Sequence, residues 1–179
     1  MNKNFRGFTL VELMVAIAIL GILIAVAAPD LRNFLNSSRL NSFSGDVTSS
    51  LALARSEAMK RGLTVTMAPA SGTNFNNGWV IFVDSDAPSG TFPTGGTAIV
   101  RQGAYGTTMS GVVTLGSPQS FISFDRLGRS ILTDLAPGLG RIEMKLLDGS
   151  TTLKQGTLCM AWGGRTRLVP DLVGAGLCN

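Results

Sequence analysis

The apolar residues of the chain collect in one run near its start. Residues 8–28 read FTLVELMVAIAILGILIAVAA and contain a single charged side chain, Glu12. As a helix that rises about 1.5 Å per residue, this run would be about 31 Å long, which matches a bilayer core of roughly 30 Å. Lys3 and Arg6, the charged residues ahead of the run, are both basic and predict that the start of the chain stays in the cytoplasm while the remainder crosses the membrane.

Beyond Pro29 the apolar positions take the spacing of an amphipathic helix. They recur at steps of three and four, at Leu40, Phe43, Val47, Leu51, Ala54 and Ala58. Lys60, Arg61 and Gly62 follow as the basic last turn and the left-handed cap of such a helix. We therefore expect one helix from Phe8 to Arg61, with a kink at Pro29 and its later part packed on a sheet.

From residue 62 onward, short apolar runs alternate with Gly, Pro, Asn and Asp, which is typical of strands and tight turns. The runs predicted as strands are residues 63–68, 78–83, 98–102, 111–115, 121–124, 130–133, 141–147, 157–162 and 166–169. Strands that follow one long helix predict an α+β fold, in which residues 62–179 form a β-rich head.

Composition argues against most enzyme chemistry. The 179 residues suit one domain, and the absence of His removes Ser-His-Asp and Cys-His nucleophiles and every His-based metal site. With no paired buried carboxylates and no nucleotide loop, we expect a protein that is not an enzyme and uses neither cofactor nor metal. Asp84, Ser85 and Asp86 have part of a calcium-loop pattern but lack its full spacing and its terminal Glu, so we expect a turn there.

The residues that flank the apolar run distinguish two kinds of targeting segment. An ordinary secretory signal would be cut after the run, at Ala25-Val26-Ala27. A glycine immediately before the run and a carboxylate inside it favour a helix that is kept, because a carboxylate in hydrocarbon is costly unless it has a partner or a function.

The segment Gly7-Phe8-Thr9-Leu10-Val11-Glu12 resembles the class III signal of type IV pilins and type II secretion pseudopilins. The resemblance implies that a prepilin peptidase cuts between Gly7 and Phe8 and methylates the new terminus at Phe8. Residues 1–7 would then be the leader, residues 8–28 the transmembrane assembly helix, and residues 29–61 its amphipathic continuation. Glu12 would neutralise the terminal amine of a neighbouring subunit in a fibre, the alternative being a snorkelling or protonated Glu12 without a role.

Three further segments resemble the FimT/GspH family of minor pilins. They are residues 54–62 (ARSEAMKRG), 77–84 (NGWVIFVD) and 122–128 (ISFDRLG). The resemblance implies a single-pass protein of the bacterial inner membrane with a periplasmic head, which joins other major and minor pilins in a pilus fibre or its tip. The family serves both pili and type II secretion systems, so a purely structural minor pilin and a secretion pseudopilin are open alternatives.

Cys159 and Cys178 fall in the part that this topology places in the periplasm. That compartment is oxidising, and an even pair of cysteines there predicts one disulfide. The bond would enclose 18 residues and contribute roughly 3 kcal/mol in the chain-entropy model. Two separate buried thiols are the alternative, and zinc is not expected without His or a second Cys pair.

The predicted disulfide loop contains a basic tetrapeptide, Gly164-Arg165-Thr166-Arg167. In an extended strand both arginines point to one side, their forked donors match phosphate oxygens, and Gly163 and Gly164 open the main chain to a polyanion. Thr166 either adds a hydroxyl or faces the other way. The alternatives are a solvated strand edge and an ion pair with Asp171.

The same tetrapeptide is similar to the GRxR motif by which FimT-type minor pilins of naturally competent bacteria bind DNA. The similarity implies double-stranded DNA as a partner during uptake. From residue 119 to 179 there are seven basic residues against five acidic ones, so the excess of positive charge is small. Binding is therefore expected to be weak, independent of base sequence and reduced by salt.

Overall fold

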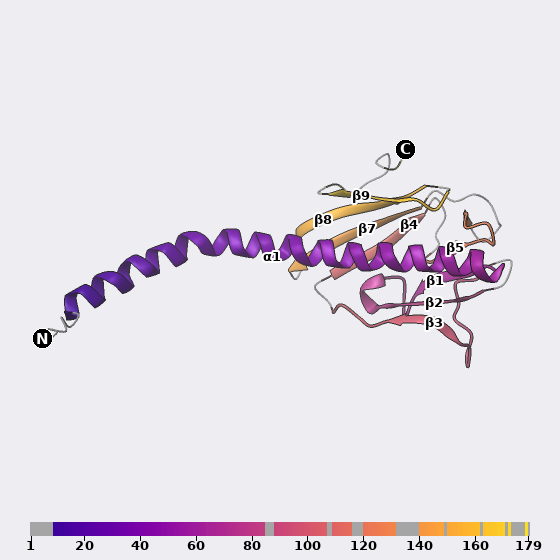
Figure 1. Ribbon diagram of the computed structural model, residues 1–179, viewed down its shortest axis with the longest axis horizontal. Helices are drawn as coiled ribbons and strands as arrows, with labels where there is room; N and C mark the ends of the chain where they lie inside the picture. The colour runs from indigo at the N-terminus through magenta and orange to yellow at the C-terminus, as the bar shows by residue number, and fades with distance from the viewer. Residues whose placement is uncertain are drawn as a thin grey trace, which may run out of the picture. The chain divides into compact units, whose positions relative to one another are not determined.

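The structure is a computed structural model that describes residues 9–84, 88–106, 109–115, 120–131, 140–148, 150–161, 163–170, 172 and 178. The chain divides into two compact units, Met1–Ser37 and Ser38–Asn179. Helix α1 (Leu10–Arg61) begins in the first unit and ends in the second, which also holds all the described strands (Figure 1).

Helix α1 continues through Pro29 as a single element of 52 residues, as its two apolar patterns predict. It ends where expected: Gly62 has a φ of 66° and its N–H donates a hydrogen bond of 2.9 Å to the carbonyl of Ala58. In the part of the chain that the structure describes, no helix combines the length and the apolar character of a membrane span. The predicted leader, residues 1–7, and Phe8 lie outside the described residues, and the division at residues 28 and 29 stays a prediction.

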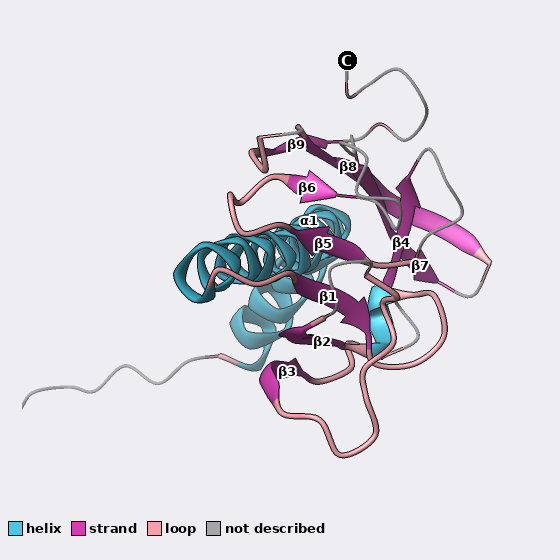
Figure 2. Ribbon diagram, turned by 90° about the vertical axis from the view of Figure 1, so that its right-hand side faces the viewer, coloured by secondary structure: helices cyan, strands magenta, loops and turns pink. Residues whose placement is uncertain are grey.

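The strands form two antiparallel sheets (Figures 1 and 2). The five-stranded sheet has the order β3 (Ala98–Gln102), β2 (Trp79–Val83), β1 (Val65–Pro69), β5 (Ile122–Phe124) and β6 (Ser130–Ile131). The four-stranded sheet has the order β4 (Met109–Leu115), β7 (Gly140–Asp148), β8 (Thr151–Met160) and β9 (Thr166–Pro170). A short 3₁₀ helix, η1 (Phe75–Asn77), precedes β2.

Every predicted strand has a counterpart, and the α+β fold is confirmed, but several strand ends differ. The largest difference is in β8, which begins at Thr151 rather than at residue 157 because it pairs with β7 along its whole length. Its first residues, TTLKQG, are mostly polar and therefore carry no strand signal of their own. Residues 132, 133 and 162, predicted as strand ends, lie outside the described residues.

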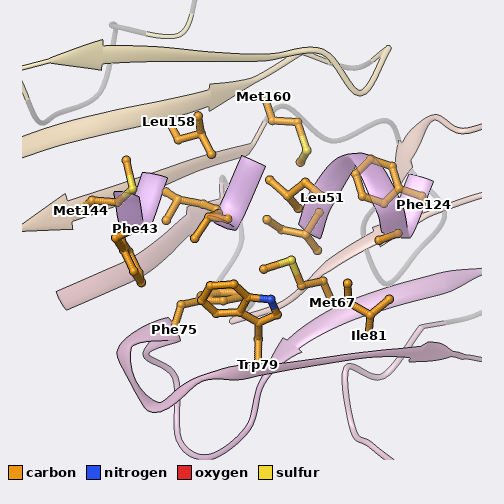
Figure 3. Close-up of a cluster of buried hydrophobic side chains, with 14 of the residues drawn as sticks. Phe43, Leu51, Met67, Phe75, Trp79, Ile81, Phe124, Met144, Leu158 and Met160 are labelled. Carbon is orange, nitrogen blue, oxygen red and sulfur yellow. The ribbon is translucent and has the colours of Figure 1, made fainter. Parts of the chain in front are cut away.

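The core lies between the second part of α1 and both sheets. All six helix residues predicted to form the apolar face are buried. Figure 3 shows Leu158 and Met160 of β8 on one side of Leu51, and Met67 and Trp79 of the other sheet on the opposite side. These side chains belong to one continuous cluster, so residues 38–61 of α1 join the two sheets into a single head.

Candidate nucleic-acid interface and assembly helix

A tight turn joins β8 to β9, and its described residues, Ala161 and residues 163–165, lead into the basic tetrapeptide. The N–H of Ala161 donates to the carbonyl of Arg165, and the N–H of Gly164 donates to the carbonyl of Ala161, each at 2.8 Å. Gly164 has a φ of 73°, a conformation that glycine adopts without a steric penalty. This β8–β9 turn therefore places Arg165 directly before the first residue of β9.

Arg167 lies on the edge strand β9, and Arg165 directly precedes it. Arg165 and Arg167 are exposed while Thr166 between them is half-buried, which is the alternation expected of extended backbone. Thr166 pairs with Met160 and Arg167 with Cys159, and no described strand pairs with the other edge of β9. This alternation of exposure is the one that a same-side arrangement of the two arginines predicts, and that arrangement stays a prediction. Asp171, the predicted alternative partner, lies outside the described residues.

The two glycines before Arg165 differ in what surrounds them. A Cβ built on Gly163 would meet nothing within 4 Å, so this backbone is open as predicted. A Cβ on Gly164 would lie 3.0 Å from Cδ and Nε of Arg55 and 3.0 Å from the carbonyl oxygen of Gly128. The sequence prediction that both glycines open the main chain to a ligand therefore holds sterically at Gly163, whereas Arg55 occupies the corresponding space at Gly164.

The predicted disulfide is present between Cys159 of β8 and Cys178, with an S–S distance of 2.03 Å. Close to it, the hydroxyl of Thr157 donates a hydrogen bond of 2.8 Å to the carbonyl of Leu172. Both contacts hold residues that follow β9 in the sequence, Leu172 and Cys178, against β8. They therefore fasten the element that carries Arg165 and Arg167 from its far end.

A second turn, residues 125–129 between β5 and β6, lies against the first through Gly128. The carboxylate of Asp125 accepts hydrogen bonds from the N–H groups of Leu127 and Arg129, at 2.9 and 2.8 Å, and from Nε of Arg129 at 2.7 Å. Desolvation is the largest influence on this carboxyl and raises its pKa, but the hydrogen bonds from Arg129 and Leu127 outweigh it and lower the pKa below the ordinary value. Asp125 therefore stays ionised and holds the turn closed.

At the other end of the chain, Glu12 belongs to a capping box at the start of α1. Its N–H donates to the hydroxyl of Thr9, and its carboxylate accepts from the Thr9 N–H and hydroxyl, each at 3.2 Å. Sequence reasoning missed this local role, although the spacing T-x-x-E is a known signal for it. Gly7 and Phe8, the predicted cleavage and methylation residues, lie outside the described residues.

No metal centre is found among the residues that the structure describes, since no three or more His, Cys, Asp or Glu side chains come together. Asp84 accepts a hydrogen bond of 3.1 Å from the N–H of Gly90, as a turn residue would. Ser85 and Asp86, its neighbours in the predicted turn, lie outside the described residues.

Two family models match the chain. Residues 2–28 match the prokaryotic N-terminal methylation motif, and residues 44–164 match the type II transport protein GspH. Among curated proteins, the chain is 36% identical over 72 residues to the type IV major alpha-pilin of Moraxella bovis, covering 40% of this chain and 45% of that protein. It is 33% identical over 93 residues to fimbrial protein Q of Moraxella bovis, covering 52% of each. The chain thus spans about half the length of the curated relatives it matches.

Solved structures share the fold at low sequence identity. The type IV minor pilin FimU of Pseudomonas aeruginosa superposes with a TM-score of 0.58 at 18% identity, over 82% of this chain and 99% of that one. The minor pseudopilin EpsH of the type 2 secretion system of Vibrio cholerae superposes with a TM-score of 0.51 at 12% identity, over 73% and 96%. The resemblance deduced from the leader and the interior motifs is confirmed by these matches. Since the GspH model covers more than half of its residues, the chain belongs to the GspH family of minor pilins and pseudopilins.

Proposed function

We propose that this protein is a minor pilin of a type IV pilus, cut after Gly7, methylated on Phe8 and held in the bacterial inner membrane by residues 8–28 until it enters the fibre. The match of residues 2–28 to the methylation motif supports the processing step. Glu12, the one charge within residues 8–28, would meet the amine of a neighbouring subunit during assembly.

Mass spectrometry of the mature protein tests this processing. The expected mass is that of a chain that begins at a methylated Phe8. A mature protein that keeps Met1, or one trimmed beyond Ala27, would contradict the proposal, because the helix would then be an uncut anchor or a discarded secretory signal.

We further infer that the head binds double-stranded DNA through Arg165 and Arg167. The observation that carries this inference is that both arginines are exposed at the start of an edge strand, with Thr166 half-buried between them, directly after a turn that leaves Gly163 open. A guanidinium group offers two parallel N–H donors to phosphate oxygens. Two guanidinium groups at alternate positions suit the repeating phosphates of the DNA backbone better than they suit a single base. Single sites of this size bind weakly, and many copies on one fibre would add to the affinity.

Fluorescence anisotropy with a short duplex of mixed sequence tests the DNA site. The purified full-length chain in mild detergent should bind, and R165A/R167A should bind more weakly, with a log–log salt dependence shallower by about 2 because two phosphate contacts are lost. R39A/R101A is the matched control, since it removes the same charge from an exposed helix position and from β3, an edge strand of the other sheet. Equal binding by the two double variants would contradict the assignment.

The family match favours one second candidate, a minor pseudopilin of a type II secretion system. The matching model is described as a type II transport protein, and EpsH shares the fold. Deletion of the gene separates the candidates when piliation, DNA uptake and protein secretion are scored in the same strain. Loss of secretion with intact pili would assign the protein to secretion, and loss of uptake or of pili with normal secretion would assign it to the pilus.

A further inference from the structure

Arg55 of α1 lies where the β5–β6 turn and the β8–β9 turn meet. Its Nε is 3.0 Å from the position of a Cβ on Gly164 and 3.0 Å from that of a Cβ on Gly128. Both glycines have a φ of 73°, so two left-handed glycines from two turns border this side chain; at Gly128 the side chain of Met59 shares the space, with its sulfur 2.8 Å from the position of a Cβ. Arg55 therefore adjoins the basic tetrapeptide in space although 110 residues separate it from Arg165.

The guanidinium of Arg55 has no counter-charge among the described residues. Its Nε is buried and has no hydrogen-bond partner there, while the residue as a whole is half-buried. The carboxylates on the elements beside it are already engaged: Asp125 binds Arg129 at 2.6 Å, and Glu57 binds Arg61 at 2.6 Å. A guanidinium that is partly desolvated and unpaired gains from an anion more than a fully hydrated one does.

We propose that Arg55 is a third phosphate-binding cation of the DNA site, which the tertiary structure adds to Arg165 and Arg167. The proposal rests on the proposed function, and it extends the site from one strand edge to a surface that includes the helix. Gly164 then has a specific use: its missing side chain admits Arg55 next to Arg165. Arg126, exposed in the adjoining turn, adds positive charge to the same region.

The variant R55Q tests the proposal, because it removes the charge and keeps a polar side chain. R55Q should weaken duplex binding severalfold and make the log–log salt dependence shallower by about 1, as expected for one lost phosphate contact. R39Q is the matched control, since Arg39 is exposed on the same helix 16 positions earlier. R55K, which keeps the charge, should retain the wild-type salt dependence.

An unchanged salt dependence in R55Q would overturn the proposal, whether or not affinity falls, because a residue that only supports the turn contributes no phosphate contact. The nitrogen NMR signal of the Arg55 side chain in the wild-type chain gives a second test that needs no variant. Duplex DNA should shift or broaden the Arg55 Nε–H signal, and a shift at Arg165 without one at Arg55 would overturn the proposal. If R165A/R167A binds like the wild type, the proposed DNA site itself fails, which is a separate outcome.

Discussion

The hydroxyl of Tyr105 donates a hydrogen bond of 2.5 Å to the carboxylate of Asp46 and so joins the segment after β3 to α1. The Tyr105 ring packs edge-on against Phe43 at 4.9 Å and stacks on Trp79 at 5.7 Å. The backbone N–H of Tyr105 also donates a hydrogen bond of 2.8 Å to the carbonyl of Asn76. One residue of a loop thus connects the helix, η1 and the aromatic part of the core.

This contact predicts a loss of stability in alkali. Burial, reinforced by the hydrogen bond to Asp46, raises the pKa of Tyr105 far above its ordinary value. A raised pKa in the folded state means that the contribution is complete below the unfolded value of about 10 and is lost as pH rises through the folded value. Because the chain has a single tyrosine, tyrosinate absorbance follows this group alone. Y105F should lower the free energy of unfolding by about 1 kcal/mol at neutral pH and remove its dependence on pH in alkali. Ionisation of Tyr105 in the folded protein at the ordinary pKa of tyrosine would contradict this.

The lowered pKa of Asp125 predicts the opposite dependence in acid. Its contribution is present above the unfolded value of about 3.9 and is lost as pH falls through the lower, folded value. D125N should lower the free energy of unfolding by about 1–2 kcal/mol at neutral pH, because the N–H groups of Leu127 and Arg129 lose a charged acceptor. Urea unfolding at neutral pH and near pH 3 measures the effect, and the difference in free energy of unfolding between D125N and the wild type should be smaller in acid. A difference that is the same at both pH values would show that the turn does not depend on this charge.

The disulfide should stabilise the head by roughly 3 kcal/mol, since it closes a loop across a sequence separation of 19 residues. C159A/C178A is the suitable variant, because Cys159 is buried and alanine adds no hydroxyl there. Chemical unfolding of the variant, and of the wild type with and without reductant, measures the loss. Reductant should destabilise the wild type and leave the variant unchanged; a wild type indifferent to reductant would refute the prediction.

Two leucines of α1 give a direct test of the helix face. Leu51 is 1% exposed in the core and Leu53, two residues later, is 37% exposed. L51A should therefore lower the free energy of unfolding by about 2–5 kcal/mol, whereas L53A should cost less than about 1 kcal/mol. Thermal or urea unfolding of the two variants side by side is the measurement. Similar losses for both would mean that this face of α1 does not form the interface with the sheets.

Local sequence patterns were sufficient to predict the helix face and most of the strands of the head. The spacing of Phe43, Val47 and Leu51 determines which face of α1 is buried, because helix periodicity is a property of neighbouring residues. Strand positions followed in the same way from apolar runs and turn residues. The first half of β8 was the exception, since residues such as Lys154 and Gln155 become a strand only through pairing with β7.

The residues alone were enough to predict the α+β class, the buried helix face, the family and, with only two cysteines, which residues form the disulfide. They also predicted that Arg165 and Arg167 share one side of the chain, because side chains alternate in extended backbone whatever the partner strand is. The division of the strands into two sheets and the contact of Arg55 with Gly128 and Gly164 emerge only from the folded chain. Such contacts depend on the packing of segments far apart in the chain, and no local spacing encodes them.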